Sequence, residues 1–224
     1  MIGLRIRKRR QAVSWGLIEK YRCLPVANVS DNMCRLSAGG ARLRPMHDGS
    51  PLAGPAVTVK APPGDNLFLH KALDLAEPGD VIVVDAGGDL TNSLFGEMMA
   101  AHAIARKIGG LVINGAVRDA AALRESSLPV FAAGVTHRGP YKNGPGEINV
   151  PIAIDGMVVE PGDLILGDED GVLCVPHDAA EEVYARSLAK QAAEAAHIED
   201  IRRGRSDRSW IDVTLQKLGC LIEP

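Results

Sequence analysis

The sequence predicts a mixed α/β fold, and the strongest evidence for it lies in the central third of the chain. Residues 81–84 and 111–113 are short, uninterrupted apolar runs, which are typical of strands covered on both faces. The segment between them is long enough for a helix, and Gly109 and Gly110 end that helix just before the second run. Residues 81–113 therefore have the size and order of a βαβ unit, whose crossover should be right-handed.

The elements before this unit alternate between helix and strand. Residues 16–36 combine helix and turn, and residues 30–32 (Ser-Asp-Asn) offer N-cap side chains to a short helix. Alternating β-branched residues predict a strand over 54–60, which the Pro-Pro-Gly-Asp segment 62–65 stops. Residues 66–75 then suit a helix, because four leucines give it an apolar surface.

The elements after the first apolar run continue this pattern. Asn92 or Ser93 is the expected N-cap of a helix that runs through Ile108. A short helix over 120–125 and a strand over 130–133 should follow the second apolar run, and the polar, glycine-rich residues 138–149 should form a loop.

The C-terminal part predicts further β segments and one long helix. Residues 160–165 repeat the Glu-Pro-Gly-Asp pattern of residues 77–82, so we expect the same turn into a strand to be used twice. Residues 178–203 are rich in alanine and carry a narrow apolar stripe, which suits a helix that lies against another subunit. The β segments are expected at 151–154, 157–159, 163–166 and 171–175.

Composition and charge exclude several classes of protein. The 224 residues are 46% hydrophobic and 24% charged, as in an ordinary globular domain. A net charge of -3 and 4% aromatic residues provide neither an electrostatic footprint nor a stacking platform for nucleic acid. No apolar run approaches the roughly 20 residues of a membrane span, and the basic residues 1–10 suggest a frayed or packed arm rather than a signal peptide. Four cysteines without a C-x-x-C pair indicate reduced thiols, which are typical of the cytoplasm. Together, these observations lead us to expect a cytoplasmic protein without nucleic-acid or membrane partners.

The residues best suited to chemistry lie in and after the central helix. Residues 96–99 fall in its expected first turn, where unpaired amides and the helix dipole attract a carboxylate or a phosphate. Arg118 and Asp119 follow the second strand at its carboxyl end, which is where ligands collect in open α/β sheets. The βαβ geometry therefore predicts that Glu97 lies close to Arg118 and Asp119.

This group of residues is suited to binding a 2-oxo acid. A guanidinium can hold a carboxylate through two hydrogen bonds, and carboxylate oxygens suit a hard divalent ion such as Mg²⁺. Such an ion would act as a Lewis acid on the keto oxygen beside the bond that breaks. A purely structural interpretation is the alternative, because a surface Arg-Asp pair is worth under about 1 kcal/mol and the dipole alone favours a glutamate in a first turn.

Five histidines show no spacing typical of metal ligands, so we expect surface or packing roles for them. They are His70, His102, His137, His177 and His197.

Six segments together resemble a known family: residues 29–31, 54–58, 79–85, 96–97, 114–119 and 162–172. Through them the chain resembles the RraA-like family, which includes the 4-hydroxy-4-methyl-2-oxoglutarate/4-carboxy-4-hydroxy-2-oxoadipate aldolases. The resemblance covers roughly residues 25–205. It implies a β/β/α sandwich of the swivelling, phosphohistidine-domain type, assembled as a homotrimer or as a hexamer of two trimers. The expected parts are an N-terminal arm or helix (1–24), the α/β core (25–176) and a C-terminal helical extension (177–224).

The resemblance also implies roles for individual residues. In the family's aldolases, the amides at the helix start and the arginine hold pyruvate, and the following aspartate binds the divalent metal. Asp119 would therefore bind Mg²⁺ or Mn²⁺, and Glu97 would reach the metal through water. The residues implied to bind substrate are Gly96, Glu97, Met98, Met99 and Arg118.

Glu194 and Ala122 are two further positions that can be compared with the family. Glu194 matches a glutamate that the C-terminal helix of a neighbouring subunit contributes to the aldolase site, and a solvated helix glutamate is the alternative. The implied catalytic residues are thus Arg118, Glu97 and Glu194. The family's aldolases tend to carry an acidic residue three positions after the metal-binding aspartate, whereas this chain has Ala122, so an anchor for an outer-shell water is missing.

The expected function is that of a divalent-metal-dependent lyase that acts on small 2-oxo acids and releases pyruvate. It would cleave 4-hydroxy-2-oxo acids by a retro-aldol reaction, with oxaloacetate decarboxylation as a side activity. The alternative is a non-catalytic RraA-like regulator that binds a ribonuclease or helicase partner. A methyltransferase acting on quinone precursors is a third label in the family, but the sequence has no glycine-rich nucleotide loop of the expected form to support it.

Overall fold

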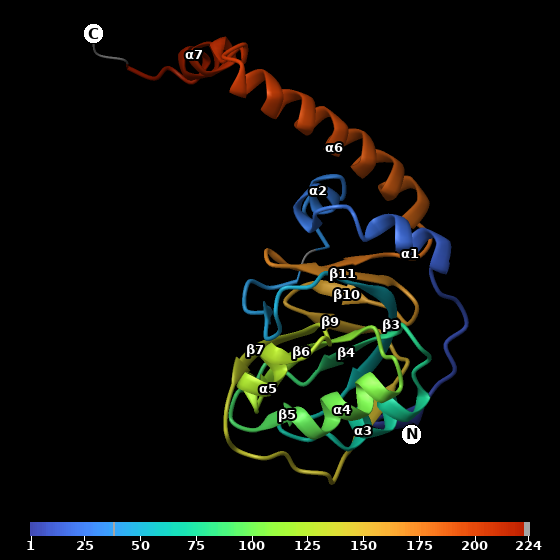
Figure 1. Cartoon of the computed structure of the whole chain (residues 1–224). Coiled ribbons are helices and arrows are strands. Elements are labelled where there is room, and N and C mark those ends of the chain that lie inside the picture. The colour runs from blue at the N-terminus through green and yellow to red at the C-terminus, as the bar shows by residue number, and fades with distance from the viewer. Residues whose placement is uncertain (38, 222–224) are drawn as a thin grey trace. The chain divides into compact units, whose positions relative to one another are not determined.

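The computed structural model describes residues 1–37 and 39–221, which fall into two compact units that divide between Ser187 and Leu188. All described strands lie in the first unit (Figure 1). The strands are β1 (Leu4–Ile6), β2 (Arg44–Pro45), β3 (Leu52–Lys60), β4 (Val81–Asp85), β5 (Ser93–Phe95), β6 (Gly110–Val117), β7 (Val130–Val135), β8 (Gly146–Ile148), β9 (Ile152–Ile154), β10 (Met157–Val159), β11 (Leu164–Asp168) and β12 (Gly171–Val175). The helices are α1 (Trp15–Tyr21), α2 (Val26–Asp31), α3 (Leu67–Leu75), α4 (Glu97–Ala105), α5 (Ala120–Glu125), α6 (Ala180–Arg202) and α7 (Ser209–Lys217).

A parallel sheet of β3, β4, β6 and β7 forms the centre of the first unit. Strand β4, helix α4 and strand β6 make the predicted βαβ unit, so the α/β class is confirmed. Strand β3 belongs to two layers, because residues 52–55 pair with β11 in antiparallel fashion and residues 56–60 pair with β4 in parallel. The chain thereby passes from one β layer into the other.

Three hydrophobic clusters fill the space between the layers. The first joins one face of the sheet to α3 and α4 and includes Leu69 and Ile113. The second lies on the opposite face, where Phe131 meets residues of β9 to β12, and the third joins β11 and β12 to α1 and α2 through Ile18 and Leu173. Burial of each such side chain contributes about 1.5–3 kcal/mol. The predicted β/β/α layering is therefore confirmed, and the long helix predicted over 178–203 is α6.

The repeated Glu-Pro-Gly-Asp pattern forms the same turn twice, as predicted. Asp80 Oδ2 accepts a hydrogen bond from the Glu77 amide at 2.8 Å, and Asp163 Oδ2 accepts one from the Glu160 amide at 2.8 Å. In each turn the glycine between them has a positive φ, which favours glycine over other residues.

The prediction that residues 30–32 start a helix is wrong. Ser30 and Asp31 lie in the last turn of α2, and Asn32 is its C-cap. The helix begins instead after Pro25, whose carbonyl accepts hydrogen bonds from the Asn28 and Val29 amides. The fixed φ of proline suits the start of a helix, and this outweighs the capping tendency of the later polar residues.

The prediction that one helix runs from Asn92 or Ser93 to Ile108 is also wrong in part. Residues 93–95 form strand β5, which pairs in parallel with the end of β6, and α4 starts only at Glu97. The Ser93 hydroxyl donates to the Arg138 carbonyl rather than capping a helix. Strands β1 and β8 and helix α7 were not predicted from the sequence.

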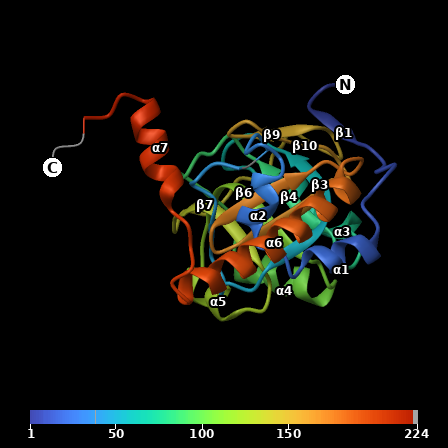
Figure 2. The same ribbon diagram turned by 90° about the horizontal axis from the view of Figure 1, so that it is seen from above.

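The N-terminal residues form a packed arm. Strand β1 pairs in parallel with β8, and the Val13 amide donates to the Gly162 carbonyl at 3.1 Å. Figure 2 shows this arm running along the outside of the core from β1 to α1. No helix among residues 1–37 and 39–221 combines the length and hydropathy needed to cross a membrane.

Candidate active site

The start of α4 and the end of β6 meet as the sequence predicted. The Glu97 amide donates a hydrogen bond to Asp119 Oδ2 at 3.0 Å, and Arg118 Nε lies 3.6 Å from the same oxygen. Parallel pairing of β5 with β6 makes this possible, because the Arg118 amide donates to the Phe95 carbonyl at 2.9 Å. A helix N-terminus, a guanidinium and a carboxylate are thus held together by backbone contacts.

Gly96 is the residue that allows this close approach. A Cβ atom at position 96 would lie 2.5 Å from Asp119 Oδ2 and 2.9 Å from Arg118 Cγ, which is closer than real side chains come. Its backbone is extended, so contact distance and not backbone strain requires the glycine here. Gly96 therefore sets the distance between the helix start and the Arg118-Asp119 pair.

Asp119 occupies a special backbone position. It is the N-cap residue of α5 and has a left-handed conformation (φ 55°, ψ 41°), which aspartate and asparagine adopt more readily than most residues. Its side chain is 40% exposed. Oδ2 accepts from Glu97, and Oδ1 accepts no hydrogen bond from any residue in the described part of the chain. One carboxylate oxygen is thus open to a ligand.

The donor set at Asp119 fits one kind of metal ion. Within residues 1–37 and 39–221, no three His, Cys, Asp or Glu side chains are grouped closely enough to enclose an ion. A site of the zinc type, with three or four protein ligands, is therefore not supported in this part of the chain. Mg²⁺ commonly binds through one or two carboxylates while keeping several waters, and a single open aspartate oxygen fits that requirement.

The amides at the start of α4 divide into two pairs. Those of Glu97 and Met99 donate within the chain, to Asp119 and to the Gly96 carbonyl. Those of Gly96 and Met98 donate to no residue among those the structure describes. Two donors of the predicted four thus remain for an anionic ligand, at the positive end of the helix dipole.

A cavity of about 170 Å³ opens beside these residues. Its walls come from α3, β5, α4, the end of β6 and the loop before β8, so residues distant in sequence meet there. The lining residues are Asn66, His70, Ser93, Leu94, Phe95, Gly96, Met98, Met99, His102, Arg118, Pro140 and Lys142. Sequence reasoning missed Asn66 and Lys142 and assigned His70 and His102 to surface or packing roles.

Asn66 is an N-cap residue whose side chain does not cap. Its Nδ2 donates to the Leu94 carbonyl at 2.9 Å and contacts Met99 Sδ at 3.4 Å. Its buried Oδ1 has no hydrogen-bond partner among the described residues. Because buried acceptors are normally satisfied, this atom is suited to a donor on a water or a ligand beside it.

His70 lines this cavity. Partial burial lowers the pKa of His70 from its usual 6.5, and Lys142 and His102 nearby lower it further, while Asp74 opposes the shift. The lowered pKa favours the neutral imidazole. A neutral imidazole in a cavity with Arg118 can accept a proton.

Glu97 and Glu194 lie in different surroundings. The Glu97 side chain is exposed, and its backbone amide contacts the Asp119 carboxylate. Glu194 lies on α6 in the second unit, where its carboxylate pairs with Lys190 at 3.0 Å. The predicted entry of Glu194 into the site of a neighbouring subunit stays a prediction.

Comparison with protein families gives one match that covers most of the chain. The family model described as "RraA-like: Aldolase/RraA" matches residues 26–174. These residues contain both the helix start at Gly96 and the Arg118-Asp119 pair.

Individual proteins show the same similarity. A Halalkalibacterium halodurans protein, named as a candidate 4-hydroxy-4-methyl-2-oxoglutarate aldolase, is 39% identical over 179 residues, or 80% of this chain and 85% of that protein. A Thermus thermophilus protein named 4-hydroxy-4-methyl-2-oxoglutarate aldolase is 39% identical over 112 residues, or 50% of this chain and 68% of that protein. The solved structure of the RNA-processing inhibitor RraA from Thermus thermophilus matches with a TM-score of 0.63 and 33% identity, covering 68% of this chain and 92% of that one.

Proposed function

Because this chain belongs to the RraA-like family, we propose that it is an aldolase that releases pyruvate from 4-hydroxy-2-oxo acids at the Gly96–Asp119 site. The observation that carries the proposal is the meeting of the α4 start with Arg118 and Asp119, through the 3.0 Å contact between the Glu97 amide and Asp119. The names of two curated relatives support the aldolase class and its substrate type.

Arg118 and the helix start provide the binding energy for the substrate carboxylate. The guanidinium can form two parallel hydrogen bonds with it, each charge-assisted. The unpaired amides of Gly96 and Met98 add donors at the positive end of the α4 dipole. The 2-oxo acid end of the substrate would therefore lie between Arg118 and the first turn of α4.

Asp119 would hold Mg²⁺ or Mn²⁺ through its open Oδ1, with Glu97 reaching the ion through water. When bound, the ion supplies Lewis-acid polarisation of the keto group. Retro-aldol cleavage and oxaloacetate decarboxylation both leave a pyruvate enolate, so we propose that decarboxylation is a side activity of the same residues. The Glu97 amide keeps the Asp119 carboxylate oriented while its other oxygen remains available.

His70 is our candidate for the group that takes the proton from the 4-hydroxyl. Its lowered pKa leaves the imidazole unprotonated at pH 7, and it lines the cavity together with Arg118. The hydroxyl proton would pass to a ring nitrogen as the C3–C4 bond breaks, C4 would become the keto carbon of one pyruvate, and the bonding pair would form the enolate of the other. Protonation of that enolate at C3, by the imidazolium or by water, would complete the second pyruvate and leave His70 neutral.

If His70 accepts the proton, kcat/KM should fall at acid pH. Activity needs neutral His70, so kcat/KM is expected to hold down to pH 6.5 and to fall below it, because the pKa of His70 is lowered. The measurement is kcat/KM between pH 5 and 8 for the wild type and for His70→Asn. A wild-type limb centred above pH 6.5, or an unchanged limb in the variant, would remove His70 from this step.

Gly96→Ala should reduce turnover about 100-fold, since the added Cβ would push the helix start away from Asp119 and Arg118 and small displacements of reacting groups are costly. Gly139→Ala is the matched control: its Cβ would make only an ordinary 3.5 Å contact with Arg118 Nη1. Both variants should be assayed for kcat and for thermal unfolding. Equal rates in the two variants would show that the spacing at Gly96 is not critical.

The direct test of the proposed function is pyruvate release coupled to lactate dehydrogenase, with 4-hydroxy-4-methyl-2-oxoglutarate and with oxaloacetate as substrates. Each rate is compared with that of the metal alone. Release from the hydroxy acid supports the aldolase, and decarboxylation alone would mean that the true substrate differs. No activity on either would favour the alternative, a regulator of a ribonuclease or helicase partner.

A homotrimer, or a hexamer of two trimers, is part of the proposal because Glu194 would serve a neighbouring subunit. Light scattering of the purified chain measures this. A monomer with full aldolase activity would exclude Glu194 from the site.

A further inference from the structure

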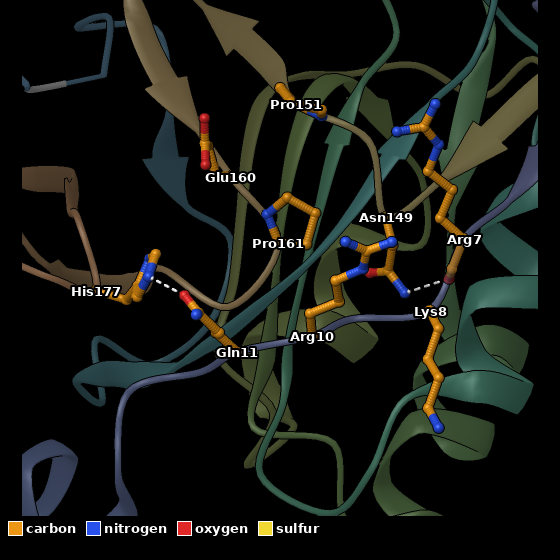
Figure 3. A pocket seen from close by; sticks show the side chains of 9 residues that line it. All are labelled: Arg7, Lys8, Arg10, Gln11, Asn149, Pro151, Glu160, Pro161 and His177. Atoms are coloured by element: carbon orange, nitrogen blue, oxygen red, sulfur yellow. Dashed lines mark hydrogen bonds between the residues drawn. The ribbon is translucent and has the colours of Figure 1, made fainter.

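A second and larger cavity, of about 750 Å³, lies between the N-terminal arm and the core (Figure 3). It shares no lining residue with the candidate active site. Its polar and charged walls are formed by Arg7, Lys8, Arg10, Asn149, Glu160 and His177. Its volume is in the range of pockets that hold small organic molecules.

The arm is fixed on both sides of this cavity. On one side, Arg5 pairs with Glu147 and helps to lower the pKa of that carboxyl to about 2, and Asn149 Nδ2 donates to the Arg7 carbonyl at 3.0 Å. Next to the cavity, Arg9 Nη1 lies 2.6 Å from Asp80 Oδ1. The backbone that carries Arg7 and Arg10 is therefore held in place.

The two Glu-Pro-Gly-Asp turns hold the rest of the arm. A Cβ at Gly162 would collide with the Gln11 carbonyl, and one at Gly79 would collide with the Trp15 ring, so the arm packs directly on both turns. His177 links the arm to the second turn: Nε2 lies 2.6 Å from Gln11 Oε1 and Nδ1 lies 3.2 Å from Asp163 Oδ1.

The cavity carries an excess of positive charge, although Arg7 also helps to lower the pKa of the Glu147 carboxyl. Of the five basic residues between positions 5 and 10, Arg5 and Arg9 pair with carboxylates. The other three, Arg7, Lys8 and Arg10, form no ion pair with a residue that the structure describes. Glu160 is the one carboxylate among the lining residues. Two guanidinium groups and one ammonium group thus line the cavity with a single carboxylate.

The side chains differ in direction. In the view of Figure 3 the Arg10 side chain overlaps that of Asn149, the Arg7 guanidinium extends toward the level of Pro151, and the Lys8 ammonium group points away from both guanidinium groups. Of the three cations, Lys8 is thus the least suited to share a ligand with the two guanidinium groups.

We propose that this cavity binds a small polyanion, a metabolite with two or more carboxylate or phosphoryl groups, through Arg7 and Arg10. Guanidinium groups match the geometry of both kinds of anion by paired hydrogen bonds. Because the arm is fixed in place without the ligand, little ordering of the backbone opposes binding. Glu160 opposes the ligand's charge and limits its affinity.

Isothermal titration of the full chain, without metal and at low ionic strength, tests this with citrate and pyrophosphate as probes. Saturable binding of at least one is expected. Arg7→Gln/Arg10→Gln should weaken it at least tenfold, because two charge-assisted contacts are lost. Glu160→Gln should tighten it about threefold, because one repulsion is removed. A gain in affinity cannot result from misfolding. Arg124→Gln, an exposed arginine on α5, is the matched control and should bind as the wild type does.

Arg118→Ala separates this cavity from the candidate active site, because Arg118 lines only the latter. Binding that persists in Arg118→Ala and is lost in the Arg7/Arg10 variant supports the proposal. Binding of citrate alone would identify a carboxylate ligand, and binding of pyrophosphate alone a phosphoryl ligand. The proposal would be overturned if neither probe binds in a saturable way. It would also be overturned if the Arg7→Gln/Arg10→Gln variant binds with the affinity of the wild type.

Discussion

Replacement of Arg118 by alanine is expected to reduce pyruvate formation to the background rate, a loss of at least about 10²–10³-fold. The guanidinium is the proposed partner of the substrate carboxylate, and the variant leaves the helix-start amides without it. The fold should persist, because the Arg118 side chain is 42% exposed and its backbone contact with Phe95 does not need the side chain.

The measurement is steady-state pyruvate release together with thermal unfolding. Arg124→Ala is the control, since Arg124 is an exposed arginine on the helix that follows Asp119. Arg124→Ala should retain the wild-type rate. Wild-type turnover in Arg118→Ala, with the same unfolding midpoint, would contradict the assignment of Arg118 to the substrate.

Replacement of Asp119 should remove activity and metal activation together. Asp119→Ala deletes the proposed metal ligand, but it also removes the acceptor of the Glu97 amide and places alanine in a left-handed conformation at a cost of about 1–2 kcal/mol. Asp119→Asn therefore tests the metal-binding role with fewer structural side effects. Asparagine tolerates that conformation and keeps an oxygen for the Glu97 amide, while it lacks the negative charge.

Both Asp119 variants should be measured for rate against Mg²⁺ concentration and for metal binding by calorimetry. Asp119→Asn is expected to unfold as the wild type does and to show neither saturable metal activation nor turnover above background. Undiminished, metal-activated turnover in this variant would remove Asp119 from the site.

The position of the candidate site could be predicted because it depends on topology. Parallel strands joined by a helix place the end of β6 beside the start of α4, whatever the side chains are. That rule brings Glu97 and Asp119 into the same neighbourhood, and the pairing of β5 with β6 and the glycine at position 96 bring them into contact. The apolar runs of β4 and β6 were likewise readable, since strands buried on both faces require continuous hydrophobic residues.

Other features depend on contacts that sequence patterns do not contain. Strand β5 is only three residues long, and its pairing with β6 gives it its conformation. The cavity also needs the loop that carries Lys142, which is held by the buried Asp65 carboxylate: Oδ2 accepts the Asn143 and Gly144 amides at 2.6 and 2.9 Å. A carboxylate that joins segments this far apart leaves no periodic signal, so the proximity of His70 to Lys142 could not be anticipated.

The most direct test of the central claim is the stoichiometry of pyruvate release from 4-hydroxy-4-methyl-2-oxoglutarate by the purified wild-type chain, with Mg²⁺ present and then chelated. Retro-aldol cleavage of this substrate gives two molecules of pyruvate and no other carbon product. We predict two pyruvates per substrate consumed, at a rate that exceeds the metal-only background and is lost on chelation. No release above background would contradict the aldolase assignment, and a rate that survives chelation would contradict the role given to Asp119.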